Sequence, residues 1–237
     1  MSSEHAVIIG GSSGIGLAAA RQLLASGLEV TITGRSAERL DEARRSLAGA
    51  KGIVMDAAAA DTLKETFSRI GSFDHLVLAL GSGKGLGPFA SVPLADVRQS
   101  FEEKVYPHFA VAQTALPFLR KEGSITFISS VSAHGAMPGT AGISAANAAV
   151  ATLVPILAVE LRPLRVNGVS PGVIDTPWWD FLPVEQRQAV FADYAGKSPV
   201  GRVGKPEDVA QAIAFLIKDS FMSGHVILCD GGLRWAA

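Results

Sequence analysis

Three glycines near the N-terminus have the type and spacing of a phosphate-binding turn. Gly10, Gly14 and Gly16 follow the apolar run 6–9 and precede a stretch of helical character. Residues without a Cβ let backbone N–H groups and the N-terminus of the next helix point at a pyrophosphate. The spacing is GxxxGxG, not the GxGxxG of the most common dinucleotide fingerprint. Such a turn also occurs without a ligand, but its place at the start of an alternating strand–helix pattern favours dinucleotide binding.

The end of the next predicted strand bears on which dinucleotide would bind. A carboxylate there would bind a ribose 2'-hydroxyl, whereas a 2'-phosphate needs a cation. This strand ends in Thr33-Gly34-Arg35-Ser36, with no acidic residue. Arg35 can reach a phosphate, and Ser36 can donate from a helix N-terminus. The alternative is that Ser36 only caps the helix and Arg35 is solvated. The sequence favours NADP(H).

The elements that position these residues alternate along the whole chain. Apolar runs predict strands near 6–10, 29–33, 51–55, 74–80, 123–129, 164–170 and 225–229. Helices are predicted near 14–26, 36–48, 59–70, 96–120, 141–161 and 206–218. Short connections between alternating strands and helices require parallel strands and right-handed crossovers, which is a doubly wound α/β (Rossmann) sheet of seven strands. The loops at the carboxyl ends of the strands should therefore meet in one crevice.

The segment at about 175–205 departs from this alternation. It is rich in proline and aromatic residues: Pro177, Trp178, Trp179, Phe181, Phe191 and Tyr194. It is predicted either to form an apolar flap over the crevice or to be a local packing or oligomer surface.

Composition sets the wider bounds. The chain has 237 residues, 48% of them hydrophobic, which favours one domain spanning 1–237 around one large core. A net charge of -1 argues against nucleic acid or an anionic membrane as partner. One cysteine, Cys229, excludes an intramolecular disulfide. The stretch 123–159 has no charged residue but is broken by Gly, Ser, Pro and Asn, so it is expected to be interior. A small-molecule substrate, a cytoplasmic location and no metal site are expected.

Seven motifs in fixed order resemble those of the short-chain dehydrogenase/reductase family, over essentially the whole chain. They are Gly10-Gly11-Ser12-Ser13-Gly14-Ile15-Gly16, Asp56, Ile128-Ser129-Ser130, Arg165-Val166-Asn167, Ser170-Pro171-Gly172-Val173-Ile174-Asp175-Thr176-Pro177, Gly201-Arg202 followed by Pro206-Glu207-Asp208, and Asp230-Gly231-Gly232. The resemblance implies a cofactor-dependent oxidoreductase that forms a homotetramer or dimer through the helices at 96–120 and 141–161.

The same resemblance implies roles for cofactor-binding residues. Those expected around the pyrophosphate are Gly10, Ser12, Ser13, Gly14, Ile15 and Gly16. Asp56 and Ala57 are expected at the adenine. Those expected along the nicotinamide are Pro171, Gly172, Ile174 and Thr176. Gly81 and Asn147 are further candidate cofactor-binding residues.

The expected active site is incomplete. The family uses a serine, a tyrosine about thirteen residues later and a lysine four residues after that. Ser130 is present, but the tyrosine position is Ile143 and the lysine position is Asn147. The family's Asn-Asn-Ala-Gly after the fourth strand is Leu78-Ala79-Leu80-Gly81. The usual proton donor is therefore missing.

Lys104 occupies the position where the family has a further asparagine. Since Asn147 occupies the position of the family's lysine, the pattern indicates that the two residue types have exchanged places. By helical spacing Lys104 lies on a stripe predicted to face the sheet, with Val97, Phe101, Val105 and His108. Pro107 predicts a bend there. A buried lysine needs partners, and Asn147 and the cofactor ribose are candidates. The alternative is that Lys104 reaches the surface or that the register is wrong by one turn.

Two functions of different classes follow. One is an NADP(H)-dependent oxidoreductase acting on a small carbonyl, alcohol or enone, in which Ser130 binds the substrate oxygen, Lys104 supplies positive charge, and the proton comes from water or His134. The other is an NADP(H)-binding sensor or scaffold that has lost catalysis. A non-redox enzyme in the same crevice is a weaker third possibility.

Overall fold

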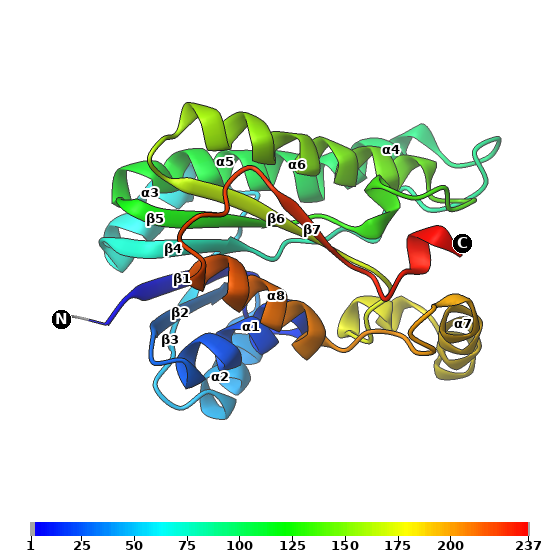
Figure 1. The fold of residues 1–237 in the computed structure, drawn as a ribbon, viewed down its shortest axis with the longest axis horizontal. Helices are drawn as coiled ribbons and strands as arrows, with labels where there is room; N and C mark the ends of the chain where they lie inside the picture. The colour runs from blue at the N-terminus through cyan, green and yellow to red at the C-terminus, as the bar shows by residue number, and fades with distance from the viewer. Residues whose placement is uncertain (1–2, 237) are drawn as a thin grey trace.

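Seven parallel strands form one sheet in the order β3-β2-β1-β4-β5-β6-β7 (Figure 1). The computed structural model describes residues 3–236. The strands are β1 (His5–Ile9), β2 (Glu29–Gly34), β3 (Lys51–Val54), β4 (Phe73–Leu78), β5 (Leu119–Ile128), β6 (Arg165–Pro171) and β7 (Val226–Cys229). The strand order reverses between β1 and β4, which is where a doubly wound sheet opens a crevice at its carboxyl edge. The predicted fold class is confirmed.

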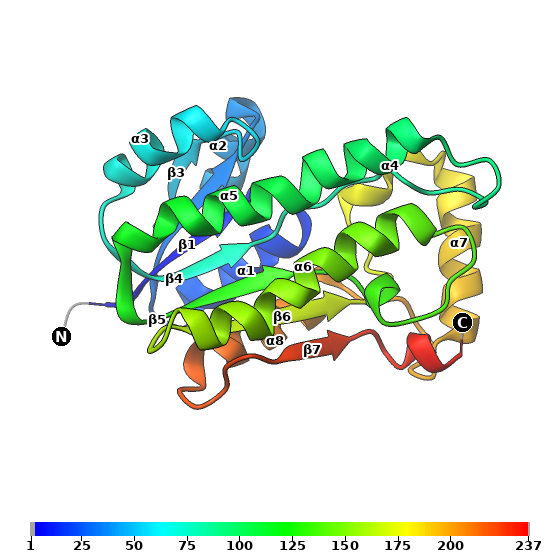
Figure 2. The same cartoon turned by 90° about the horizontal axis from the view of Figure 1, so that it is seen from above.

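Helices cover both faces of this sheet (Figures 1 and 2). One face carries α1 (Gly14–Ala25), α2 (Ala37–Ser46) and α8 (Pro206–Lys218). The other carries α3 (Ala60–Ile70), α5 (Tyr106–Ala115) and α6 (Ala141–Glu160), with α4 (Leu94–Ser100) leading into α5. Each face has its own apolar core, the first centred on residues such as Ile8 and Ile213 and the second on residues such as Phe67 and Phe127. The buried strands read as continuous apolar runs because both their faces are covered.

α6 is apolar for most of its length. Among residues 3–236 it is the one helix long and apolar enough to cross a membrane by length and composition alone. Its buried residues recur every three or four positions: Gly142, Ile143, Ala146, Asn147, Val150 and Val154. This spacing is that of a helix packed against a sheet, so α6 is a core helix that carries two residues of interest, Ile143 and Asn147, toward the carboxyl edge.

The helix predicted at 96–120 is present as a continuous helical stretch from Leu94 to Phe118, but it is not one regular α-helix. α4 ends at Ser100, a π-helical turn spans Phe101–Val105, and α5 ends at Ala115. A 3₁₀ turn then leads directly into β5, which begins at Leu119 rather than near 123. Pro107 has no N–H to donate, so the regular i→i−4 pattern cannot continue through this region, and the π turn absorbs the irregularity.

The segment at about 175–205 contains a helix that the sequence did not reveal. A 3₁₀ turn covers Pro177–Phe181, and α7 spans Val184–Lys197. α7 stands at the carboxyl edge of the sheet, beyond the ends of the strands (Figure 2). Among the described residues, α7 has none that is buried. Its sequence therefore lacks the periodic apolar residues by which core helices are predicted.

Candidate active site

A cleft of about 890 Å³ opens at the carboxyl edge of the sheet. Its walls come from the β1–α1 turn, the ends of β4, β5 and β6, the start of α6, and the segment 176–194. The predicted site residues that line it are Gly10, Ser13, Gly14, Ile15, Gly16, Arg35, Gly81, Lys104, Ser130, Asn147, Pro171, Gly172, Ile174 and Thr176. Most residues predicted from motifs far apart in the chain thus meet in one place.

The β1–α1 turn has the geometry that a pyrophosphate requires. Gly10 has a φ of +82°, and a Cβ there would lie 2.5 Å from the carbonyl oxygen of Ala79. A Cβ on Gly16 would collide with the carbonyl of Gly10. α1 begins at Gly14 with no acidic residue in its first turn, and its N-cap Ser13 makes no side-chain capping bond. The turn is therefore a backbone cradle at a helix N-terminus, and these residues fit a dinucleotide phosphate.

Two arginines line the cleft beyond this turn. Arg35, at the end of β2, was expected; Arg39, one helical turn later on α2, was not. The (i, i+4) spacing was the signal that could have identified Arg39. Ser36 accepts a hydrogen bond from the backbone N–H of Arg39 at 3.3 Å and so caps α2. Two cations at this end of the cleft suit a phosphate group.

Five predicted site residues are not among those lining the cleft: Ser12, Ser36, Asp56, Ala57 and His134. Asp56 instead accepts from the backbone N–H of Ala58 at 3.0 Å. His134 follows the 3₁₀ turn Val131–Ala133, and its Nε2 lies 3.0 Å from the hydroxyl of Ser170 on β6. His134 thus contacts β6 and is absent from the cleft lining, although its position four residues after Ser130 favours a place near the substrate.

Lys104 lies on the floor of the cleft. Its side chain is buried, and Nζ donates to the carbonyl oxygens of Leu80 at 3.2 Å and Ser129 at 3.5 Å. Burial lowers the pKa of this amine to about 8. The predicted inward orientation is observed, and the alternative of a lysine that reaches the surface is not. The two carbonyls follow β4 and β5, so the ammonium ties together the ends of two central strands.

Asn147 presents an unpaired acceptor in the same region. Its Nδ2 donates to the carbonyl of Ile143 at 2.9 Å and to the hydroxyl of Ser132 at 3.3 Å. Its Oδ1 is buried and has no hydrogen-bond partner among the described residues. A buried acceptor without a hydrogen bond destabilises the folded state unless a donor reaches it. A hydroxyl of a bound ribose is such a donor, so Asn147 fits the expected cofactor.

Ser130 and Ile143 face the cleft at the substrate end. Ser130 accepts a hydrogen bond from the backbone N–H of Ser132 at 3.4 Å, which leaves its own proton to donate to a substrate oxygen. Ile143 is 8% exposed and forms part of the wall. An isoleucine there can exclude water but cannot supply a proton.

His108, which the sequence placed only on a buried stripe, supports Lys104. Its Nδ1 lies 2.7 Å from the carbonyl oxygen of Lys104 and its Nε2 lies 3.2 Å from that of Leu78. Burial, together with the nearby Lys104 charge, lowers the pKa of His108 to about 3. The imidazole is neutral, so it donates to one of these two carbonyls at a time, and it packs between the π turn and the end of β4.

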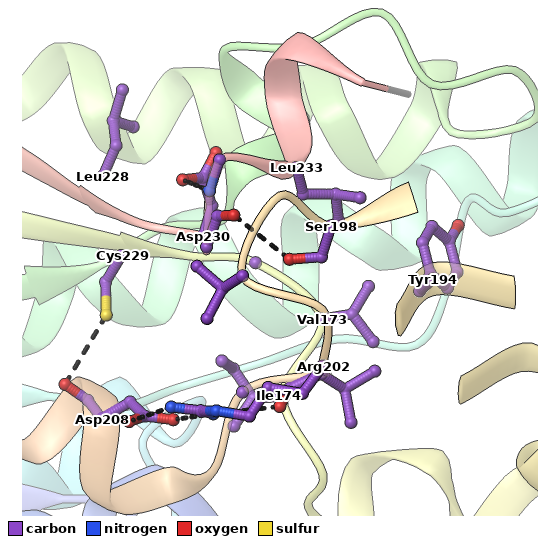
Figure 3. Close-up of a pocket in the computed structure, with 16 residues that line it drawn as sticks. Val173, Ile174, Tyr194, Ser198, Arg202, Asp208, Leu228, Cys229, Asp230 and Leu233 are labelled. Carbon is purple, nitrogen blue, oxygen red and sulfur yellow. Dashed lines mark hydrogen bonds and ion pairs between the residues drawn. The ribbon is translucent and has the colours of Figure 1, made fainter. Parts of the chain in front are cut away.

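A second, smaller cavity of about 380 Å³ lies between β7 and α7 (Figure 3). Its charged groups have partners: Arg202 binds Asp208 at 2.7 and 3.0 Å, and Asp230 pairs with Arg234 at 3.8 Å. The hydroxyl of Ser198 donates to the carbonyl of Gly231 at 3.1 Å. Tyr194 lines both cavities. With its ionic groups already satisfied, this cavity is less suited to an anionic cofactor than the larger cleft.

Comparison with known proteins agrees with this geometry. A family model described as enoyl-(acyl carrier protein) reductase matches residues 10–234. The chain is 34% identical over 241 residues to cis-4-hydroxycyclohexanecarboxylate dehydrogenase of Sinomonas cyclohexanicum, covering 96% of this chain and 95% of the relative. It is 33% identical to the 3-oxoacyl-(acyl-carrier-protein) reductase of Thermotoga maritima, covering 96% of each.

Solved structures give the same result. A crystal structure of a small-chain dehydrogenase in complex with NADPH superposes with a TM-score of 0.84 at 29% identity, covering 99% of this chain and 100% of that one. The glycine turn, the seven-stranded sheet and matches over nearly the full length agree with one another. The chain therefore belongs to the short-chain dehydrogenase/reductase family.

Proposed function

We propose that this protein is an NADP(H)-dependent oxidoreductase acting on a small carbonyl, alcohol or enone substrate, with a proton path that does not use a tyrosine at the family's usual position. One observation carries the proposal. The cleft joins the phosphate cradle at Gly10 and Gly14 to a hydroxyl donor, Ser130, while the position of the expected proton donor is Ile143.

NADP(H) is the cofactor that the charges favour. Arg35 and Arg39 both line the cleft at the end of β2 and start of α2. A 2'-phosphate would contact cations there, whereas a free ribose would find no carboxylate at the strand end. The relative of known structure that binds NADPH supports this choice.

The roles of the protein residues follow from their positions. When bound, the nicotinamide supplies or accepts a hydride. Ser130 would donate a hydrogen bond to the substrate oxygen, and Asn147 would accept one from a cofactor hydroxyl. Lys104 has two carbonyl partners, so its charge would act on the developing negative oxygen through space. Because Ile143 cannot ionise and His134 is not among the residues that line the cleft, the proton would come from water rather than from either of these side chains.

The missing acid favours one substrate type. Removing a positioned proton donor typically costs ~10²- to 10⁴-fold in rate. When hydride is transferred to a simple ketone, the negative charge develops on a single oxygen, and a proton donor must stabilise it in the same step. An enone that accepts hydride at its β-carbon spreads the negative charge over oxygen and the α-carbon, and water can protonate the α-carbon afterwards. Enones should therefore be reduced faster than matching saturated ketones.

A direct test follows NADPH absorbance with a panel of aldehydes, ketones and enones. The expected result is faster NADPH oxidation with enones than with ketones, slowed by Ser130→Ala. NADPH deuterated at the transferable C4 position should place deuterium on the β-carbon of the product, as mass spectrometry would detect. Absence of turnover across the panel by a protein that binds NADPH would overturn the proposal.

The alternative is an NADP(H)-binding sensor or scaffold. It is favoured by Ile143 in the cleft wall and by the position of His134 outside that wall. The same experiment separates the two functions. A sensor would bind NADPH but would not oxidise it with any substrate in the panel.

A further inference from the structure

Four aromatic side chains gather in the segment 176–194, which forms one wall of the cleft. This aromatic cluster consists of Trp178, Trp179, Phe181 and Phe191. The two indoles meet edge to face at 4.7 Å between ring centroids, and Phe181 stacks on Trp179 at 6.1 Å. Phe191 of α7 meets Trp179 edge to face at 5.6 Å. The first three of these residues line the cleft. Such mutual contacts fix the rings in place.

Both indole N–H groups are already used. Trp178 donates to the carbonyl of Ser82 at 3.0 Å, and Trp179 donates to the carbonyl of Ile174 at 3.0 Å. The first bond joins the turn after β6 to the loop after β4. A Cβ on Gly81 would lie 3.7 Å from the Trp178 ring, so the indole closely covers this glycine. The indoles therefore offer a ligand aromatic carbon and no hydrogen-bond donor.

Other parts of the cleft wall are apolar. They include Leu86, Met137, Ile143, Leu182, Ala189 and Val190. Besides two arginines, the charged lining residues are Lys104, held by two carbonyls, and Asp193, paired with Lys197 at 2.7 Å. Among the described cleft residues, both arginines lie at the β2 end. The cluster residues carry no charge and Lys104 keeps its two carbonyl partners, so the aromatic cluster itself offers a substrate carboxylate or phosphate no ion pair.

We propose that the cleft takes a neutral, ring-bearing substrate, whose ring lies against Trp178, Trp179 and Phe181 and whose oxygen faces Ser130. This inference rests on the proposed oxidoreductase function, since it names the substrate class for the same site. An apolar ring gains by leaving water for an aromatic wall, whereas an anionic group would lose its hydration without a compensating partner.

The test measures ligand binding apart from catalysis. Calorimetry on the NADP⁺-loaded protein, which cannot reduce an enone, compares cyclohex-2-enone with the acyclic pent-3-en-2-one and with 4-oxocyclohex-2-ene-1-carboxylate. The neutral ring should bind roughly tenfold more tightly than either comparison ligand. Equal affinities for the ring and the acyclic enone, or tighter binding of the carboxylate, would overturn the inference.

Variants locate the binding site. Trp179→Ala should weaken cyclohexenone binding roughly tenfold and leave NADP⁺ and pent-3-en-2-one affinities unchanged. Trp235→Phe is the matched control, because Trp235 is 79% exposed and lies outside the cleft lining. Unchanged NADP⁺ affinity in Trp179→Ala shows that the variant is folded. Undiminished cyclohexenone binding in that folded variant would remove the aromatic cluster from the site.

Failure of this inference is distinguishable from failure of the proposed function. If cyclohexenone binds as expected but NADPH does not reduce it, the ring site stands and the oxidoreductase function fails. If acyclic or anionic enones bind and are reduced as well as cyclohexenone, the function stands and the substrate class is wrong.

Discussion

Lys104 is linked to Asn147 through Ser129. The Lys104 ammonium donates to the Ser129 carbonyl at 3.5 Å, and the Ser129 hydroxyl donates to the backbone carbonyl of Asn147 at 2.8 Å. The sequence predicts that the Lys104 ammonium reaches Asn147 or the cofactor ribose. Among the hydrogen bonds of residues 3–236, the connection between Lys104 and Asn147 is indirect. The cation enters the site from the π turn before α5, and the amide enters from α6.

The buried ammonium should make stability depend on pH in alkali. The ordinary pKa of a lysine is 10.5, and burial lowers that of Lys104 to about 8. Between these values the unfolded chain binds more protons than the folded one, so the free energy of unfolding rises with pH. Relative to Lys104→Met, the wild type should gain stability from pH 8 to 10.5, by roughly 3 kcal/mol at most.

Urea unfolding at several pH values checks this. Lys218→Met, an exposed change at the end of α8, is the control and should leave the pH dependence of the wild type intact. A constant difference between wild type and Lys104→Met across this range would show that the buried amine does not titrate there.

The two arginines at the β2 end should set the cofactor preference. A charge-assisted contact with a 2'-phosphate contributes ~1.5–3 kcal/mol, so NADPH should bind roughly ten- to a hundredfold more tightly than NADH. Arg35→Ala and Arg39→Ala should each reduce NADPH affinity while leaving NADH affinity nearly unchanged. Arg45→Ala, at the other end of α2, is the matched control.

Calorimetry with both nucleotides measures these affinities. Equal affinities in the wild type, or a preference for NADPH that survives both substitutions, would remove the 2'-phosphate assignment from this part of the cleft.

Long periodic elements and the glycine turn were predictable because their determinants are local. Continuous apolar runs identified the strands, and Gly10, Gly14 and Gly16 identified the turn, since a Cβ at Gly10 or Gly16 would collide with backbone. The inward position of Lys104 was predictable from helical spacing. The π turn around it was not, because it depends on how the bend at Pro107 packs against β4.

Side-chain positions outside regular elements were the least predictable. His134 was placed near the substrate because it follows Ser130 by four residues, but a 3₁₀ turn points it at Ser170. α7 escaped prediction because its contacts are with the cleft rather than with a core. The roles of Trp178 and Trp179 depend on hydrogen bonds to Ser82 and Ile174, which only the tertiary fold brings within reach.

The outer faces of α5 and α6 should join copies of the chain. Tyr106 and Phe109 on α5, and Ile156 and Val159 on α6, are each at least half exposed. Both helices cover the same face of the sheet (Figure 1). Exposed apolar groups on neighbouring elements are typical of a symmetric interface, so we expect a homotetramer or dimer.

Light scattering gives the mass directly. The wild type should exceed the monomer mass of 24.6 kDa, and Phe109→Asp combined with Val159→Asp should lower the mass toward it. Phe221→Asp is the control, because Phe221 is 97% exposed on a loop after α8. A wild-type mass equal to the monomer at all concentrations would contradict the prediction.

Reversing the apparent exchange of residues tests whether Lys104 has replaced the missing lysine. Ile143→Tyr with Asn147→Lys and Lys104→Asn should restore a proton donor at the cleft wall with a cation one helical turn away. Carbonyl reduction should rise, by up to ~10²- to 10⁴-fold, which is the usual contribution of a positioned acid. Ile143→Tyr alone should gain much less, because no lysine at position 147 would lower the tyrosine pKa.

NADPH oxidation with a saturated ketone, measured from pH 6 to 10, compares the triple variant with Ile143→Tyr, and NADPH affinity confirms that each variant is folded. In the alcohol-oxidising direction the new tyrosine must be ionised, because it accepts the proton of the alcohol. The triple variant should therefore lose alcohol-oxidising activity as the pH falls through the pKa of that tyrosine. A triple variant that binds NADPH yet reduces ketones no faster than Ile143→Tyr would show that the lysine of the π turn and the asparagine of α6 are not functional substitutes for each other.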